Sequence, residues 1–118
     1  MSDSMEFFER FKWRCIWSCE GVRDTWEAER SFRQWVWANL ASAALGFVLL
    51  SGAELAMILA LGIMVLVVEL LNTGIERAVD LVSLEKSDLA KQAKDAASGA
   101  VMLCAVAVGV AWVVVLFS

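Results

Sequence analysis

The sequence predicts an all-α membrane protein of one domain (residues 1–118), in which an amphipathic surface helix precedes three transmembrane helices. Hydrophobic residues make up 60% of the chain, whereas soluble globular proteins typically contain roughly 45–50%. Lys, Arg, Asp and Glu are absent between Arg33 and Glu54 and again after Asp95. Uncharged, apolar segments of this length are typical of membrane-spanning helices. The sequence also has no proline, so long helices can continue without a break.

Residues 4–30 are predicted to form the surface helix. At helical spacing, one set of mostly apolar residues falls within roughly 80° of arc: Phe8, Phe11, Cys15, Cys19, Val22 and Trp26. An apolar face with Phe and Trp, opposite a charged face, suits a helix that lies in the membrane interface. The alternative is an ordinary amphipathic helix that packs on protein.

Three apolar segments follow, at residues 34–53, 55–80 and 96–118. The first has about 20 residues, which as a helix matches the ~30 Å hydrocarbon core of a bilayer. Gly52 is the expected break between the first two segments, and Ser87 or Asp88 can cap the third helix. In the second segment the uncharged part ends at Val68 after about 14 residues, which is short for a span. The polar residues after Val68 must therefore begin inside the hydrocarbon or at its edge.

The positions of Lys and Arg indicate the orientation in the membrane. All ten lie before residue 34 or between residues 77 and 94. Because cytoplasmic segments carry an excess of Lys and Arg, the N-terminus and the loop at residues 81–95 are expected in the cytoplasm and the C-terminus outside. Binding of nucleic acid is not expected, since acidic residues are interleaved with the basic ones.

A stripe of polar residues marks the second span. Glu69, Asn72, Glu76 and Asp80 lie at i, i+3, i+7 and i+11, which places them within about 80° on one helix face. A charged side chain at the centre of a membrane costs ~2.5–3.5 kcal/mol on insertion scales. Glu69 is therefore a candidate functional residue, and partial burial would strengthen it as a base. Glu76 and Asp80 have a simpler alternative as the solvated end of a helix that leaves the membrane.

The residue types limit the chemistry. The sequence has no histidine, no G-x-x-x-x-G-K-S/T loop and no G-x-G-x-x-G motif, so imidazole catalysis and the common nucleotide-binding loops are excluded. If the helices bundle, Glu29, Lys94 and Asp95 approach the stripe at the inner membrane surface. Carboxylates of this kind can act as a base or bind Mg²⁺ together with substrate phosphates. Lys94 and Asp95 can also be a simple interfacial anchor pair. The residues alone thus leave open a phosphotransferase or an ion-coupled site.

Three segments resemble the prokaryotic diacylglycerol kinase family of small, three-span membrane kinases. They are GVRDTWEAERSFRQ (residues 21–34), VELLNTGIERAVDLVS (residues 68–83) and AKDAASGAV (residues 93–101). The core of the similarity is E-x-x-N-x-x-x-E, followed by Lys-Asp at the next span, and it extends over nearly the whole chain. The resemblance implies a homotrimer in the bacterial inner membrane, with composite active sites that phosphorylate diacylglycerol to phosphatidic acid with Mg²⁺ and ATP.

The resemblance also implies roles for individual residues. Glu69 would be the general base, Asn72 would orient its neighbours, and Lys94 would contact the ATP phosphates. Mg²⁺ would be held by Glu29 and Glu76. The implied ATP-binding residues are Arg10, Trp17, Glu29, Glu76, Glu85, Lys86, Ser87, Lys94 and Asp95. The implied contacts of the lipid substrate are Arg10, Arg23, Trp26, Ser31, Gln34, Glu69, Ser98 and Trp112.

The sequence departs from the family pattern at a few positions of the surface helix. Trp17 stands where the family has a tyrosine near the nucleotide, so a phenolic hydrogen bond is absent there. Trp13 and Glu20 replace basic residues, which weakens attraction to anionic lipids.

Two other functions remain as alternatives. The first is phosphorylation of undecaprenol by the same fold, which the E-x-x-N-x-x-x-E core does not exclude. The second, of a different class, is a small ion-coupled transporter in which Glu69 exchanges a proton. Transport does not explain why Glu29, Glu76, Lys94 and Asp95 would gather at one surface.

Overall fold

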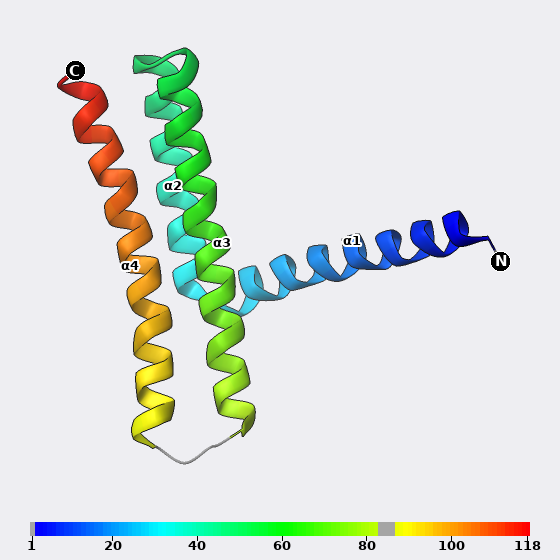
Figure 1. Ribbon diagram of the computed structural model, residues 1–118. Coiled ribbons are helices and arrows are strands. Elements are labelled where there is room, and N and C mark those ends of the chain that lie inside the picture. The colour runs from blue at the N-terminus through cyan, green and yellow to red at the C-terminus, as the bar shows by residue number, and fades with distance from the viewer. Residues whose placement is uncertain (1, 83–86) are drawn as a thin grey trace. The chain divides into compact units, whose positions relative to one another are not determined.

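The computed structural model describes residues 2–82 and 87–118, and it confirms the all-helical prediction (Figure 1). The described residues form α1 (Asp3–Ala28), α2 (Arg30–Leu49), α3 (Gly52–Val82) and α4 (Asp88–Leu116). The chain divides into two compact units, Met1–Arg30 and Ser31–Ser118. The first unit is essentially α1, and the second contains the other three helices.

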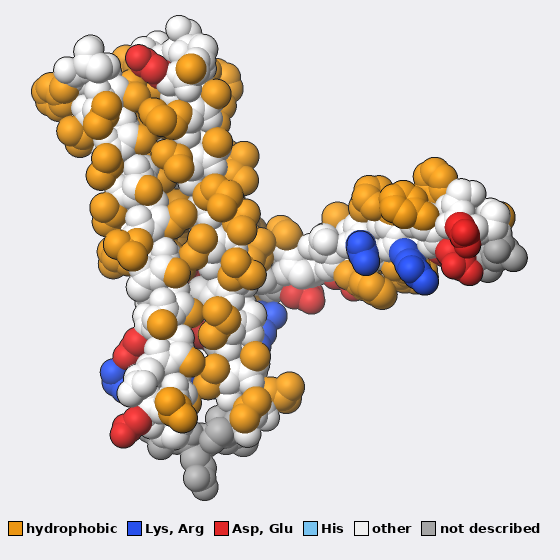
Figure 2. Space-filling model, in the orientation of Figure 1, with side chains coloured by type: hydrophobic (Ala, Val, Ile, Leu, Met, Phe, Trp, Pro, Cys, Tyr) orange, Lys and Arg blue, Asp and Glu red, His pale blue; other side chains and the backbone are white. Residues whose placement is uncertain are grey.

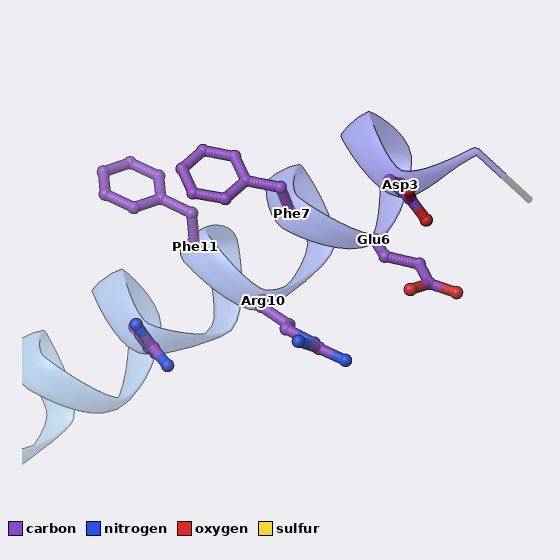
Figure 3. A pocket seen from close by; sticks show the side chains of 6 residues that line it. Asp3, Glu6, Phe7, Arg10 and Phe11 are labelled. Carbon is purple, nitrogen blue, oxygen red and sulfur yellow. The ribbon is translucent and has the colours of Figure 1, made fainter.

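Helix α1 begins at a capped N-terminus, and much of its apolar surface is exposed. The Ser2 hydroxyl accepts a hydrogen bond from the backbone N–H of Met5 at 3.4 Å, which satisfies one donor of the first turn. Phe7 and Phe11 stack on one side of the helix with ring centroids 6.3 Å apart, while Glu6 and Arg10 extend from another side (Figure 3). Both rings are more than half exposed, as expected of a helix that covers its apolar face with lipid or with protein.

In the second unit, α3 packs along α4, and hydrogen bonds connect α2 to both of them. Small and β-branched side chains are buried along this packing: Ile58, Val65, Ala97, Val101, Ala111 and Val115. Small residues allow close approach of helix backbones, which is the usual basis of helix packing in membranes. The connection between α2 and α3 passes through Gly52, whose φ of 58° is a left-handed conformation that glycine adopts without steric cost. The predicted break at Gly52 is therefore confirmed.

The surface of the second unit is largely apolar (Figure 2). Helices α3 and α4 have 31 and 29 residues and long apolar stretches. Among the described helices, these two are long and apolar enough to cross a membrane. The exposed apolar side chains on them suit contact with lipid or with further helices. Helix α2 is shorter, with 20 residues, and the expected span at residues 34–53 stays a prediction.

A close contact between α2 and α3 occurs at Gly62. The Asn39 side chain donates to the backbone oxygen of Trp35 at 3.2 Å, and its Oδ1 lies against Gly62. A Cβ atom at residue 62 would overlap that oxygen. The absence of a side chain at Gly62 thus leaves room for the Asn39 amide of α2 in the position where it bonds to Trp35.

Gly62→Ala is expected to destabilise the protein. The methyl group forces the Asn39 amide out of its place and breaks its bond to the Trp35 oxygen; such small-to-large changes cost about 1–3 kcal/mol, more than the ~1 kcal/mol that alanine gains over glycine within a helix. The same change made in an Asn39→Ala background should lose this penalty, because the overlapping oxygen is gone. Unfolding by SDS titration in micelles measures both differences as a double-mutant cycle.

Gly109→Ala is the matched control for this cycle, since no heavy atom lies within 4 Å of the Cβ position at residue 109. It is expected to leave the free energy of unfolding unchanged or slightly increased. Equal losses from Gly62→Ala in both backgrounds would show that the cost does not come from contact with the Asn39 side chain.

Candidate functional site

A cavity of about 290 Å³ lies between α2, α3 and α4. We call it the Glu69 cavity, and its lining residues are Ser31, Trp35, Glu69, Asn72, Glu76, Ser98, Val101 and Met102. Three of the four stripe residues of α3 thus face one space, together with hydroxyl groups from α2 and α4. Asp80, the fourth, lies further along α3 and outside the lining.

Glu69 is the most buried charged residue of this cavity, with 3% of its surface exposed. The hydroxyl of Ser31, on α2, donates a hydrogen bond to Glu69 Oε1 at 2.9 Å. The hydroxyl of Thr73 donates to the backbone oxygen of Glu69 at 3.1 Å. A buried carboxylate is strongly unfavourable unless hydrogen bonds replace those it made with water. The Ser31 hydroxyl supplies one such bond from a neighbouring helix.

Asn72 and Glu76 form the second polar pair of the cavity. The Asn72 amide donates to Glu76 Oε1 at 3.4 Å, and 9% of Asn72 is exposed. The other amide atom, Oδ1, is buried and has no hydrogen-bond partner in the described part of the chain. An unpaired buried acceptor costs about 1–3 kcal/mol, so it is suited to receive a hydrogen bond or a cation from a ligand.

Charged residues gather where α3 ends and α4 begins. Figure 2 shows red and blue side chains at this lower end of the unit. Lys94, on α4, forms an ion pair with Asp80, on α3, with Nζ and Oδ1 2.5 Å apart. Lys91 pairs with Asp95 within α4 at 2.6 Å. That hydrogen bond, with the attraction between the two charges, raises the pKa of Lys91 above its ordinary value. Both pairs lie before the uncharged part of α4 and are partly exposed to solvent.

The remaining residues that the resemblance implies are distributed over the molecule. Ser87 caps α4, because its hydroxyl accepts a hydrogen bond from the N–H of Ala90 at 3.1 Å. Gln34 is exposed on α2. Trp112 lies outside the lining of the Glu69 cavity and donates from Nε1 to the Ser42 hydroxyl at 2.9 Å. Glu85 and Lys86 lie outside the described residues.

Five of the implied residues belong to the other unit, Met1–Arg30: Arg10, Trp17, Arg23, Trp26 and Glu29. Arg23 pairs with Glu27 one turn along α1 at 3.2 Å. Glu29 ends α1, with an extended backbone and an N–H that donates to the Thr25 oxygen at 2.8 Å. Each of these residues therefore has a defined place on or next to α1.

Three cavity residues were not expected from the sequence: Trp35, Val101 and Met102. Trp35 lies four residues after Ser31, and Val101 and Met102 lie three and four residues after Ser98. Residues at these spacings share a helix face. Extending the helical period from the two implied serines would have identified all three.

The donor atoms fit a hard cation, although the described residues contain no cluster of three or more His, Cys, Asp or Glu side chains that could hold a metal by themselves. Mg²⁺ commonly uses one or two protein carboxylates and completes its shell with water and substrate phosphates. The Glu76 carboxylate is a ligand of that kind, and the unpartnered amide oxygen of Asn72 is a second oxygen donor beside it.

Comparison with known proteins identifies the family to which this chain belongs. The family model "Prokaryotic diacylglycerol kinase" matches residues 16–116. A diacylglycerol kinase of Pseudomonas aeruginosa is 38% identical over 101 residues, which cover 85% of this chain and 82% of the relative. That of Escherichia coli K12 is 31% identical over 119 residues, covering 100% of this chain and 98% of the relative. An undecaprenol kinase of Bacillus subtilis is 40% identical over 105 residues, covering 85% and 79%.

These matches define an enzyme, a membrane lipid kinase with helical spans that uses ATP. The chain belongs to the prokaryotic diacylglycerol kinase family.

Proposed function

We propose that this protein transfers the γ-phosphoryl group of ATP to the free hydroxyl of diacylglycerol, at the cytoplasmic face of the bacterial inner membrane. The products are phosphatidic acid and ADP. The observation that carries this proposal is the buried carboxylate of Glu69, in a cavity that joins the apolar part of α3 to its polar end. A lipid hydroxyl and a nucleotide phosphate could meet at such a place.

Glu69 would act as the general base. It takes the proton of the lipid hydroxyl while the hydroxyl oxygen forms a bond to the γ-phosphorus, and the bond from that phosphorus to the β,γ-bridging oxygen breaks. Its carboxylate lies within the cavity, where the Ser98 hydroxyl of α4 also lies. Catalysis of phosphoryl transfer depends mainly on such positioning and on stabilisation of charge.

The polar groups beyond Glu69 would bind the nucleotide. Glu76, with Glu29, would hold Mg²⁺, which neutralises charge on the ATP phosphates when it is bound. Lys94 would leave Asp80 to bind the phosphates, and Asp95 would support the nucleotide site. The further ATP contacts proposed by family resemblance are Arg10, Trp17, Ser87 and the loop residues Glu85 and Lys86. The same resemblance supports a homotrimer with a cytoplasmic N-terminus.

Undecaprenol is a second candidate substrate, because the relative from Bacillus subtilis that is 40% identical is an undecaprenol kinase. Both lipids present a primary hydroxyl, so the Glu69 mechanism would serve either one.

Purified protein in mixed micelles with Mg²⁺ and ATP is expected to phosphorylate diacylglycerol faster than undecaprenol, with no lipid product when both are omitted. Transfer of labelled phosphate to each lipid measures the two rates. A faster rate with undecaprenol would reassign the substrate, and no transfer to either lipid would refute the proposed reaction.

Glu69→Gln is expected to reduce transfer by at least about 10²-fold, because the amide cannot accept the proton of the attacking hydroxyl. Binding of ATP, measured by equilibrium titration, should stay within about twofold of the wild-type affinity. Glu54→Gln makes the same change in the exposed first turn of α3 and should leave the rate unchanged. A matching loss of ATP affinity in Glu69→Gln would show that this residue binds nucleotide rather than acting as the base.

Glu76→Gln is expected to raise the Mg²⁺ concentration needed for half-maximal activity by at least about tenfold, since a neutral amide is a weaker ligand for a hard cation. Titration of activity with Mg²⁺ at a fixed, saturating ATP concentration gives this value, with Glu54→Gln again as the control. An unchanged Mg²⁺ dependence would remove Glu76 from the metal site.

A further inference from the structure

We propose that Ser31 is a positioning residue that holds the Glu69 carboxylate in the orientation needed to receive the proton of the lipid hydroxyl. This inference rests on the proposed function, in which Glu69 is the base. Family resemblance implies that Ser31 contacts the lipid substrate instead. The two roles predict different kinetic effects, so they can be separated.

The geometry connects the two residues directly. Ser31 Oγ donates to Glu69 Oε1 at 2.9 Å, across 38 residues of sequence. Glutamate has three side-chain torsions, so a base at its end needs an anchor to stay in one orientation. Hydrogen bonds to an ionised acceptor are stronger than those between neutral groups. The Ser31 hydroxyl is such an anchor, on a helix other than the one that carries the base.

Neighbouring polar groups make different contacts. The Thr73 hydroxyl bonds to the backbone oxygen of Glu69, which fixes the main chain and not the carboxylate. The Asn72 amide bonds to the Glu76 carboxylate. Ser31, by contrast, contacts the Glu69 carboxylate, which would take the proton. A change at residue 31 should therefore affect the reacting carboxylate first.

The place of Ser31 in α2 and its chemistry both suit this role. Ser31 is the second residue of α2 (Arg30–Leu49), so the bonded carboxylate lies near the positive end of the helix dipole. A serine hydroxyl can donate to a carboxylate and can also accept from a carboxylic acid. Ser31 can thus stay hydrogen-bonded to Glu69 before and after the proton is transferred.

Ser31→Ala is expected to lower kcat for phosphorylation of diacylglycerol about tenfold, because a base that samples other orientations reacts less often. KM for diacylglycerol and for ATP should change less than about twofold, since binding of both substrates remains. Ser31→Thr keeps the hydroxyl and adds one methyl group at an exposed position. It should restore kcat to within about threefold of the wild-type value.

Ser42→Ala is the matched control, because it removes another hydroxyl of α2 that forms a 2.9 Å bond between helices, here with Trp112. It should keep the wild-type kcat, which separates loss of an interhelical bond from loss of the bond to Glu69; because Trp112 is an implied lipid contact, any effect of Ser42→Ala is expected in KM for diacylglycerol and not in kcat. An unchanged kcat in Ser31→Ala would overturn the inference. So would a raised KM for diacylglycerol at unchanged kcat, which indicates a lipid contact, or a Ser31→Thr variant as slow as Ser31→Ala.

Glu69→Gln, assayed in parallel, separates the two levels of the proposal. An active Glu69→Gln variant would refute the proposed base, and the role of Ser31 with it. An inactive Glu69→Gln variant beside a fully active Ser31→Ala variant would refute only the positioning role.

Discussion

The burial of one carboxylate constrains the rest of the second unit. Glu69 is 3% exposed within a helix that is otherwise apolar enough to span a membrane. A carboxylate at such a place must be hydrogen-bonded, and the Ser31 hydroxyl meets this need only if the start of α2 lies against the middle of α3. The Asn39 side chain of α2, which lies against Gly62 of α3, also requires α2 beside α3. Packing and polar chemistry therefore require the same arrangement of helices.

The face of α3 that carries Glu69 becomes progressively more exposed along the helix. Glu69 and Asn72 are buried, Glu76 is half-buried, and Asp80 is exposed in an ion pair with Lys94. These residues span about 16 Å of helix axis. A lipid kinase has to bring together an alcohol that stays in the membrane and a nucleotide that stays in water. In the proposed mechanism, one helix face that extends from an apolar to a solvated environment would meet the lipid at one end and the nucleotide at the other.

The sequence predicted the helices and the stripe well, because both depend on local periodicity and on where charge is absent. It predicted the start of the third span at residue 96 from charge, whereas α4 begins at Asp88. The Ser87 cap determines where the helix starts, and charge determines only its membrane part. The Ser31–Glu69 bond and the Asp80–Lys94 pair depend on the distance between helices and on side-chain orientation. Periodicity within one segment carries no information about either.

The Asp80–Lys94 pair is compatible with a role for Lys94 in binding phosphate. The two side chains are 56% and 40% exposed, and exposed ion pairs typically contribute only about 0–1 kcal/mol. Lys94 can therefore exchange Asp80 for a phosphate oxygen at little cost, because a phosphate group carries more charge and offers several acceptor oxygens. Before a phosphate binds, Asp80 holds the Lys94 ammonium group beside α3. Asp80 is on the same helix as Glu76 and Asn72. The pair thus keeps a cation next to the groups that would meet the nucleotide, without a bond too strong to be replaced.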